Sequence, residues 1–190
     1  MAKKDVVISR TKYSRRLSFK FYLFYMFSST YSPYMIFIAT AVVLGISLTN
    51  TFKANEKGMN IIFPWVLTAF CLMMIPLIII MRINDVIKQE TPEIRKSVDT
   101  IEVSKHKIER NNSAIEGRLT LSWQQLKLIC ETKKYFYFYT QENNGFIVVK
   151  DDIIEGDAVT LRKIIKENAP LNKRGRQVFR AYYKPVKASK

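Results

Sequence analysis

Two long apolar segments dominate the pattern of hydrophobic and polar positions along this chain of 190 residues. No charged side chain occurs between Lys20 and Lys53, and none occurs between Lys57 and Arg82. A helix needs roughly 20 mostly apolar residues to cross the ~30 Å hydrocarbon layer of a bilayer. The pattern therefore predicts a transmembrane hairpin, which covers residues 34–81 with spans at about 34–50 and 61–81.

Prolines and small residues set the expected details of the two spans. Pro33 marks the start of the first span, because a proline disfavours a helical conformation in the residue before it. Gly45 and Ser47 offer small side chains for close helix contact, although a purely lipid-facing helix is equally compatible with the pattern. Pro64 is placed in the first turn of the second span, where a proline is tolerated, and Pro76 is expected to kink this span.

The period of the apolar positions changes to two after a polar connector at residues 82–96, which is expected to be partly helical. Such alternation is typical of strands with one buried face. The pattern predicts strands at residues 98–104, 105–111, 117–121, 126–131, 135–141 and 146–150, and a helix at 158–168. The expected fold class is therefore α+β, with a transmembrane hairpin of two helices and a cytoplasmic, antiparallel β-rich domain that a C-terminal helix closes. This domain is expected to cover residues 97–170.

Turn and capping residues support the last two predicted strands and the helix that follows them. Asn144 and Gly145, after Asn143, supply the positive φ angles that a tight hairpin turn demands. Asp157 can cap the helix that follows. The apolar side of this helix carries Val159, Leu161, Ile164 and Ile165.

Aromatic side chains alternate along residues 135–141. Because successive side chains of a strand point to opposite faces, Phe136 and Phe138 share one face, which we expect to lie in the core. The other face is expected to be half exposed, and it carries Tyr135, Tyr137 and Tyr139. This exposed aromatic face and the small residues of the first span are the only hints at a homo-oligomer.

Residues 1–33 form a basic and aromatic arm before the first span. Val6, Val7 and Ile8 favour a β conformation, and two interpretations stay open: an edge strand of the later domain, or an ordered arm. Residues 21–27 carry three Phe and two Tyr, which suits the headgroup level of a membrane. Residues 1–20 are too polar for a cleavable signal peptide, so the first span is expected to be an uncleaved anchor.

Positive charge is concentrated at the two ends of the chain, whose formal net charge is +15. Residues 1–33 carry seven basic side chains and one acidic, and residues 171–190 carry seven basic and none acidic. Residues 82–170 are almost neutral, with fifteen basic and fourteen acidic side chains. A pI near 9.8 would by itself suggest nucleic acid as a partner. The distribution disfavours nucleic acid and favours anionic lipid, which attracts Lys and Arg near a membrane surface.

Basic residues in the short flanks of the spans predict their orientation. Seven precede the first span and two lie in the turn between the spans. Four more follow the second span, namely Arg82, Lys88, Arg95 and Lys96. Because Lys and Arg are enriched in cytoplasmic flanks, both termini are expected in the cytoplasm.

Three stretches carry a family resemblance: LTLSW at residues 119–123, KLICETKKYFYFYT at 127–140 and FIVVK at 146–150. They resemble the YcxB-like protein family, which comprises bacterial proteins with two membrane spans, a small cytoplasmic domain and no defined function. The resemblance implies a place in the bacterial cytoplasmic (inner) membrane. The chain departs from the family where it has Val-Val-Lys ending at Lys150 instead of Ile-Pro-Lys, and in the segment after Pro170. The β-rich domain more distantly resembles bacterial pleckstrin-homology-like domains, which implies a fold but no ligand.

The sequence shows no constellation that is typical of an enzyme. His106, the only histidine, lies between two lysines, whose positive charges make it a poor base. The acids at Asp151, Asp152, Glu155 and Asp157 could gather round a cation, but acids before a helix are more simply explained by the helix dipole. We therefore expect no enzymatic activity, no cofactor and no metal.

Trp123 and the two cysteines have ordinary structural explanations. Trp123 could serve as a ligand platform, but a lone tryptophan before a strand more often fills the core. Cys71 lies in the second apolar segment and Cys130 in the β-rich domain, so we expect no disulfide between them.

Basic residues alternate with aromatic ones in the tail at residues 171–190, which is the strongest functional hint. Such a composition suits anionic lipid, although a disordered, solubilising tail is the alternative. The candidate lipid- or partner-binding residues are Arg174, Arg176, Phe179, Arg180, Tyr182, Tyr183 and Lys184, together with Arg15, Arg16 and Lys20. We expect a non-catalytic, membrane-tethered interaction or regulatory module that binds a protein partner or anionic lipid headgroups. The alternative function is immunity or self-protection against a bacteriocin or another membrane-active peptide.

Overall fold

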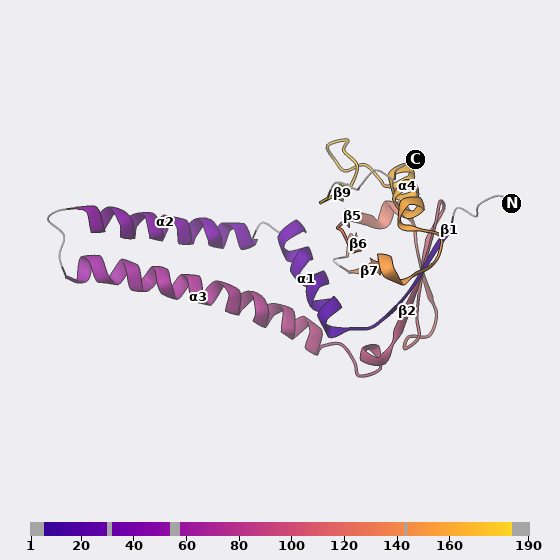
Figure 1. Ribbon diagram of the computed structural model, residues 1–190, viewed down its shortest axis with the longest axis horizontal. Coiled ribbons are helices and arrows are strands. Elements are labelled where there is room, and N and C mark those ends of the chain that lie inside the picture. Colours follow the sequence, from indigo (N-terminus) through magenta and orange to yellow (C-terminus); the bar gives the residue numbers. More distant parts are fainter. Residues whose placement is uncertain (1–5, 30–31, 54–57, 143, 184–190) are drawn as a thin grey trace. The chain divides into compact units, whose positions relative to one another are not determined.

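The computed structural model describes residues 6–29, 32–53, 58–142 and 144–183 (Figure 1). The chain divides into two compact units. The β-rich unit contains Met1–Phe21 and Glu90–Lys190, and the helical unit is Tyr22–Gln89. The chain is therefore an α+β protein in which the helical unit is inserted between two parts of the β-rich unit.

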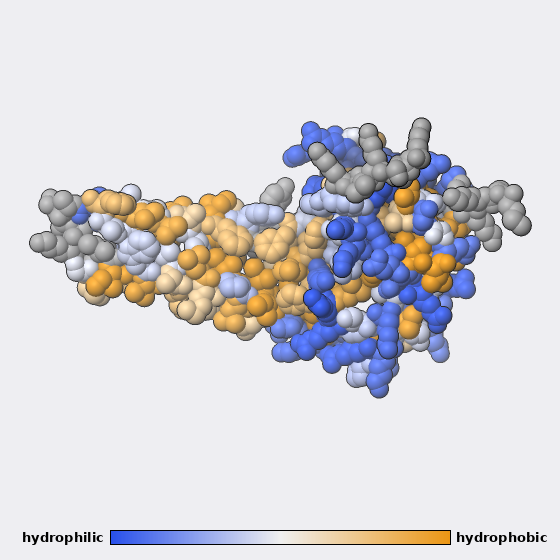
Figure 2. Space-filling view, in the orientation of Figure 1, coloured by the Kyte–Doolittle hydropathy of each residue, from blue (hydrophilic) through white to orange (hydrophobic). Residues whose placement is uncertain are grey.

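The helical unit consists mainly of α2 (Ser32–Phe52) and α3 (Met59–Lys88), which lie side by side (Figure 1). Both helices are long and apolar enough to cross a membrane, but only 11% and 17% of the residues in their apolar windows are buried. The core helices of a soluble protein bury most of their apolar side chains, which these two helices do not. Figure 2 shows hydrophobic side chains along the visible face of this unit.

Hydroxyl groups join α2 to α3. The Oγ of Ser47 lies 3.0 Å from the Oγ1 of Thr68, and both side chains are buried. One turn away on each helix, the Nε1 of Trp65 donates to the Oγ1 of Thr51 at 2.9 Å, so the helices run antiparallel. Ser47 thus makes the expected helix contact, whereas Gly45 has no neighbouring atom within 4 Å of the position of a Cβ.

The helix boundaries correct two expectations. α3 begins at Met59, so Pro64 lies beyond its first turn and is an interior proline like Pro76. α3 continues to Lys88, so the polar connector is helical in its first part, as expected. The break before the first span was expected at Ser32, but α2 already includes Ser32. α1 (Arg15–Ser29), which begins in the β-rich unit, precedes α2, and residues 30–31 lie outside the described part of the chain.

The β-rich unit contains two sheets and one longer helix, α4 (Ala158–Asn168). The first sheet has the order β4 (Arg118–Leu121), β3 (Ile108–Asn112), β2 (Val98–Ser104), β1 (Val6–Lys12) and β8 (Ile153–Glu155). The second has the order β7 (Gly145–Val149), β6 (Tyr135–Thr140), β5 (Leu126–Glu131) and β9 (Phe179–Ala181). Short 3-10 turns lie at Ile94–Lys96, Trp123–Gln125 and Lys150–Asp152. The strands from Val98 to Val149 agree closely with the prediction, whereas β8 and β9 were not predicted.

The run at Val6 to Ile8 belongs to the sheet. β1 pairs antiparallel with β2 along its whole length, from Val6 opposite Ser104 to Lys12 opposite Val98. Its other edge pairs with β8, so β1 is an interior strand. The ordered-arm interpretation is therefore wrong, and so is the placement of the strand at a sheet edge.

One hydrophobic core joins the inner faces of both sheets to α4. Phe136 and Phe138 are 0% exposed, as expected, and Trp123 fills the core with its Nε1 donating to the carbonyl of Lys105 at 3.0 Å. From α4 the core receives Leu161, Ile164 and Ile165. Val159, which was expected beside them, is 64% exposed.

The tyrosine face of β6 is not the exposed aromatic face that the alternation predicted. Tyr137 and Tyr139 are buried, and only Tyr135 is half-buried. Phe21 of α1 covers them, with its ring centroid 4.9 Å from that of Tyr139 and 6.3 Å from that of Tyr137. Burial raises the pKa of Tyr137 to about 12. The start of α1 therefore packs on the outer face of the second sheet.

Gly145 is needed for a different reason from the one the sequence suggested. Its φ is not positive, since the described glycines in that region of φ are Gly58, Gly117, Gly156 and Gly175. A Cβ at this position would lie 2.2 Å from the carbonyl oxygen of Phe138 on the paired strand. Glycine is thus required by the close approach of β6 and β7, while Asn143 of the expected turn lies outside the described residues.

Two valines test whether β1 is part of the core. Val7 is 1% exposed, so Val7→Ala should lower the free energy of unfolding by about 2 kcal/mol, through lost burial and an unfilled cavity. The matched control Val159→Ala, at an exposed helix position, should change it by less than about 0.5 kcal/mol. Urea unfolding of the full chain in micelles, followed by Trp123 fluorescence in a Trp65→Phe background, measures both. Equal effects would contradict the described position of β1.

Candidate functional site

The carboxylate of Glu131, at the end of β5, is fully buried. Arg162 of α4 donates from Nε to Oε2 at 2.8 Å and from Nη2 to Oε1 at 2.7 Å. Lys150, which follows β7, donates from Nζ to Oε1 at 2.7 Å. Bidentate arginine–carboxylate pairs are among the strongest hydrogen-bonded contacts in proteins. Glu131 therefore ties β5 to α4 and to the turn after β7.

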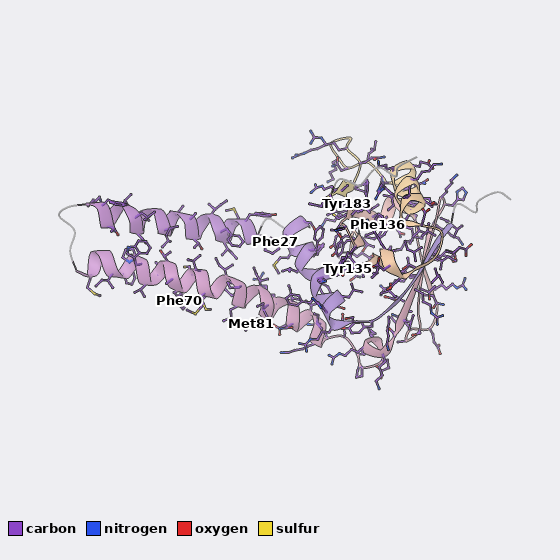
Figure 3. The ribbon with its side chains drawn as sticks, in the orientation of Figure 1. Phe27, Phe70, Met81, Tyr135, Phe136 and Tyr183 are labelled. Atoms are coloured by element: carbon purple, nitrogen blue, oxygen red, sulfur yellow. The ribbon has the colours of Figure 1, made fainter. Side chains whose placement is uncertain are left out.

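Tyr183, two residues beyond β9, completes this Glu131 cluster of Glu131, Lys150, Arg162 and Tyr183. Its hydroxyl donates to Oε1 of Glu131 at 2.9 Å and accepts from Nζ of Lys150 at 2.7 Å and from Nη2 of Arg162. The Nζ of Lys150 also lies 4.4 Å from the ring centroid of Tyr183 and 4.7 Å from that of Phe136. Figure 3 labels these two aromatic residues. Ammonium groups are attracted to aromatic faces at such distances.

The electrostatics of the Glu131 cluster suit a structural role, in which the carboxylate holds its partners in place. Burial raises the pKa of the Glu131 carboxyl, but the hydrogen bonds from Arg162, Lys150 and Tyr183 outweigh this effect and hold the pKa below the usual value. The carboxylate is therefore ionised at neutral pH, with both oxygens occupied by donors. Such a group fixes its partners and is poorly placed to accept a further proton.

Cys130, the neighbour of Glu131 on β5, is chemically inert in this setting. It is 0% exposed, and burial raises the pKa of its thiol to about 12. The thiol is therefore protonated at neutral pH, and a protonated thiol is a weak nucleophile. Cys71 of α3 is a free thiol as well.

The C-terminal tail is folded as far as the described chain extends. β9 pairs in parallel with β5, with Phe179 opposite Ile129 and Ala181 opposite Glu131. Val178 is buried, and Phe179 packs against the core. The disordered-tail alternative is therefore wrong for residues 171–183. Lys184 lies outside the described residues.

The folded tail displays its charges on a short loop, residues 171–177, which we term the basic loop. Leu171 and Gln177 form a bridge at its base, and the Oδ1 of Asn172 accepts hydrogen bonds from the backbone N–H groups of Arg174 and Arg176. In the described part of the tail, the exposed cations are Lys173, Arg174 and Arg176, which lie on the loop, and Arg180 on β9. The loop is thus a built turn that presents cations to solvent.

The predicted site residues that the structure describes differ in their exposure and contacts. Arg174, Arg176, Arg180 and Tyr182 are exposed, whereas Phe179 and Tyr183 pack inside the unit. Arg15 and Arg16 are exposed on α1. Lys20 donates from Nζ to the hydroxyl of Tyr135 at 3.2 Å, so it helps to hold α1 on β6.

The remaining chemical candidates have structural roles or lie at the surface. Asp157 caps α4 by accepting from the backbone N–H of Thr160 at 2.6 Å, as predicted. His106 is exposed. Across the described ranges, no three His, Cys, Asp or Glu side chains come together as metal ligands.

Sequence reasoning missed the Glu131 cluster, although one signal was available. Glu131 ends β5 directly after the apolar residues Leu128, Ile129 and Cys130, and a charge next to such a run is buried only when it is paired. Glu131 and Lys150 also lie inside two of the stretches that carry the family resemblance. No sequence pattern pointed to Arg162 or Tyr183 as their partners.

Comparison with known proteins confirms the family resemblance for part of the β-rich unit. The model of the YcxB-like protein family matches residues 103–165. The matched range contains Glu131, Lys150 and Arg162, but not Tyr183. Neither the curated proteins nor the solved structures contain a match to the chain.

Breaking the Glu131 cluster should destabilise the β-rich unit. Glu131→Gln leaves Lys150 and Arg162 largely buried without their counter-charge, which should cost about 3–5 kcal/mol. Tyr183→Phe removes one hydroxyl and should cost about 1–2 kcal/mol. The control Glu167→Gln breaks only an exposed pair with Lys163 and should cost less than about 0.5 kcal/mol. Urea unfolding measures all three, and tryptic cleavage after Arg180 should accelerate in the first two variants only.

The same cluster predicts a pH dependence. The pKa of Glu131 is lower in the folded chain than its usual value of 4.5, so its ionised form stabilises the fold above about pH 4.5. This contribution is lost as the pH falls through the folded-state pKa. The stability difference between the wild type and Glu131→Gln should therefore shrink on acidification. A difference that stays constant between pH 7 and the acid transition would show that the carboxylate is not held as described.

Proposed function

We propose that the chain is a membrane-anchored interaction module. α2 and α3 span the bacterial cytoplasmic membrane, and both termini lie in the cytoplasm. The mostly exposed apolar side chains of the two helices support the spans. The orientation rests on the basic residues before α2 and after α3, compared with the two in the turn between them. The β-rich unit acts without catalysis, as an interaction or regulatory module.

Anionic lipid headgroups are the partner that this module binds through the basic loop. The observation that carries the proposal is that β9 and Tyr183 hold the tail on the folded unit, so Lys173, Arg174 and Arg176 form a fixed cationic surface. A fixed loop loses less conformational entropy on binding than a disordered tail. Leu171, which is 65% exposed, adds an apolar side chain at the base of this surface.

The fold of the β-rich unit is compatible with a pleckstrin-homology-like domain. Two sheets enclose one core, and α4 covers an end of it. The chain adds β9 after this helix, so the likeness is one of general architecture and does not name a ligand. A protein partner, a homo-oligomer and the immunity function stay predictions from the sequence.

A lipid-dependent stability shift tests the proposed partner. A ligand that binds only the folded state raises its stability. A short-chain anionic phospholipid, added to the full chain in zwitterionic micelles, should therefore raise the unfolding temperature, and less so at high salt. The triple variant Lys173→Gln, Arg174→Gln and Arg176→Gln, which removes the three cations of the basic loop, should lose most of this shift.

The control triple variant removes the same number of charges at Lys105, Lys107 and Lys163, which lie outside the tail. It should keep the shift. An equal loss in both variants would indicate general charge attraction and contradict a role for the basic loop. A zwitterionic lipid that produces the same shift would contradict the choice of anionic headgroups.

A further inference from the structure

Two apolar side chains are exposed at one end of the first sheet. Ile115, in the loop between β3 and β4, is 55% exposed, and Leu119 of β4 is 51% exposed. Both line the same open concavity of about 350 Å³, together with Arg110, Asn112, Glu116, Gly117 and Arg118. The inner face of the sheet is therefore uncovered at this end. We term Ile115 and Leu119 the apolar tip.

The loop that carries Ile115 is held firmly in place. The Nδ2 of Asn112 donates to the Oγ of Ser97 at 3.0 Å and to Oδ1 of Asp99 at 2.7 Å. The Oδ1 of Asn112 accepts from the N–H of Ala114, and Ser113 and Val98 exchange two hydrogen bonds. Asp99 also forms a bidentate pair with Arg110. The exposure of Ile115 is thus a property of a fixed turn.

These hydrogen bonds attach the apolar tip to the points where the chain enters and leaves the sheet. Ser97 and Val98 are the first residues after the connector from α3. Val98 pairs with Lys12, the last residue of β1 before α1, and the N–H of Tyr13 donates to the carbonyl of Ser97. Both connections to the apolar helices therefore leave from the end of the sheet that carries the tip.

The charges around the apolar tip suit a phospholipid surface. The exposed cations at this end, Lys12, Arg95, Lys96 and Arg118, outnumber the exposed acids Glu93 and Glu116 among the described residues. Arg118 also lies 3.7 Å from the carboxylate of Glu109. An apolar centre flanked by cations matches the boundary between acyl chains and anionic headgroups.

We propose that Ile115 and Leu119 insert into the headgroup–acyl boundary of the bilayer that α2 and α3 span, while Lys96 and Arg118 lie at the phosphate level. The proposal rests on the proposed membrane anchoring, and it is independent of the basic loop. The tip then fixes the end of the β-rich unit that meets the membrane. The occupant of the concavity is lipid, and neither a second copy nor a protein partner is required.

Site-directed labelling of the full chain tests this insertion. Ile115→Cys, in a Cys71→Ser background, is labelled with an environment-sensitive fluorophore and reconstituted at one copy per lipid nanodisc that contains shallow spin-labelled lipids. Cys130 is buried and should not react. The matched control is Ile154→Cys on β8, which is 66% exposed. Emission at position 115 should shift to the blue and be quenched by the lipids several-fold more than at position 154.

A third label at Phe70, which is 57% exposed on α3, separates this inference from the anchoring itself (Figure 3). Deeply spin-labelled lipids should quench it. If Phe70 is quenched and position 115 is not, the insertion of the tip is overturned while the anchoring stands. If Phe70 is not quenched, the anchoring fails. Equal quenching at 115 and 154, or a blue shift at 115 without quenching by lipid, would also overturn the proposal.

Discussion

The pairing of β1 with β2 is the constraint on which the rest of the structure depends. It joins residues that precede the apolar helices to residues that follow them, along the full length of both strands. The helical unit is therefore an insertion within the β-rich unit. Closing so long a loop costs entropy that strand hydrogen bonds and the burial of side chains such as Val7 must offset. The start of α1 then continues from β1 onto the second sheet, where Phe21 covers Tyr137 and Tyr139.

The Glu131 cluster holds the C-terminal segment on the β-rich unit. Its carboxylate joins β5, α4 and the turn after β7, and it receives the hydroxyl of Tyr183 from the C-terminal segment. The two most basic parts of the sequence are thus attached in part to one folded unit, through β1 in one case and β9 in the other. A buried charged group of this kind favours one arrangement of its neighbours, because any other would leave a charge unpaired. The surface position of the basic loop follows from this arrangement.

The sequence predicted the local secondary structure well, but it did not predict which distant segments pack on each strand. Alternation identified the strands from Val98 to Val149 and the core positions Phe136 and Phe138. It could not show what lies against the opposite face of a strand, so Tyr137 and Tyr139 were expected at the surface. The apolar side of the helix was likewise expected to include both Val159 and Leu161, but residues two apart do not share a helix face. Val159 is exposed, whereas Ala158 of the same turn packs against the core. β1, β9 and the partners of Glu131 depend on pairings between distant segments, which no local pattern contains.

Hydrogen–deuterium exchange of the full chain in lipid nanodiscs tests the central pairing most directly. Strand amides that are bonded to neighbours on both sides exchange only when the sheet opens. If β1 is an interior strand, amides between Val7 and Thr11 should exchange as slowly as those of Ile101 and Val103 on β2. Exchange of β1 at the rate of an unstructured arm, with β2 still protected, would contradict the account.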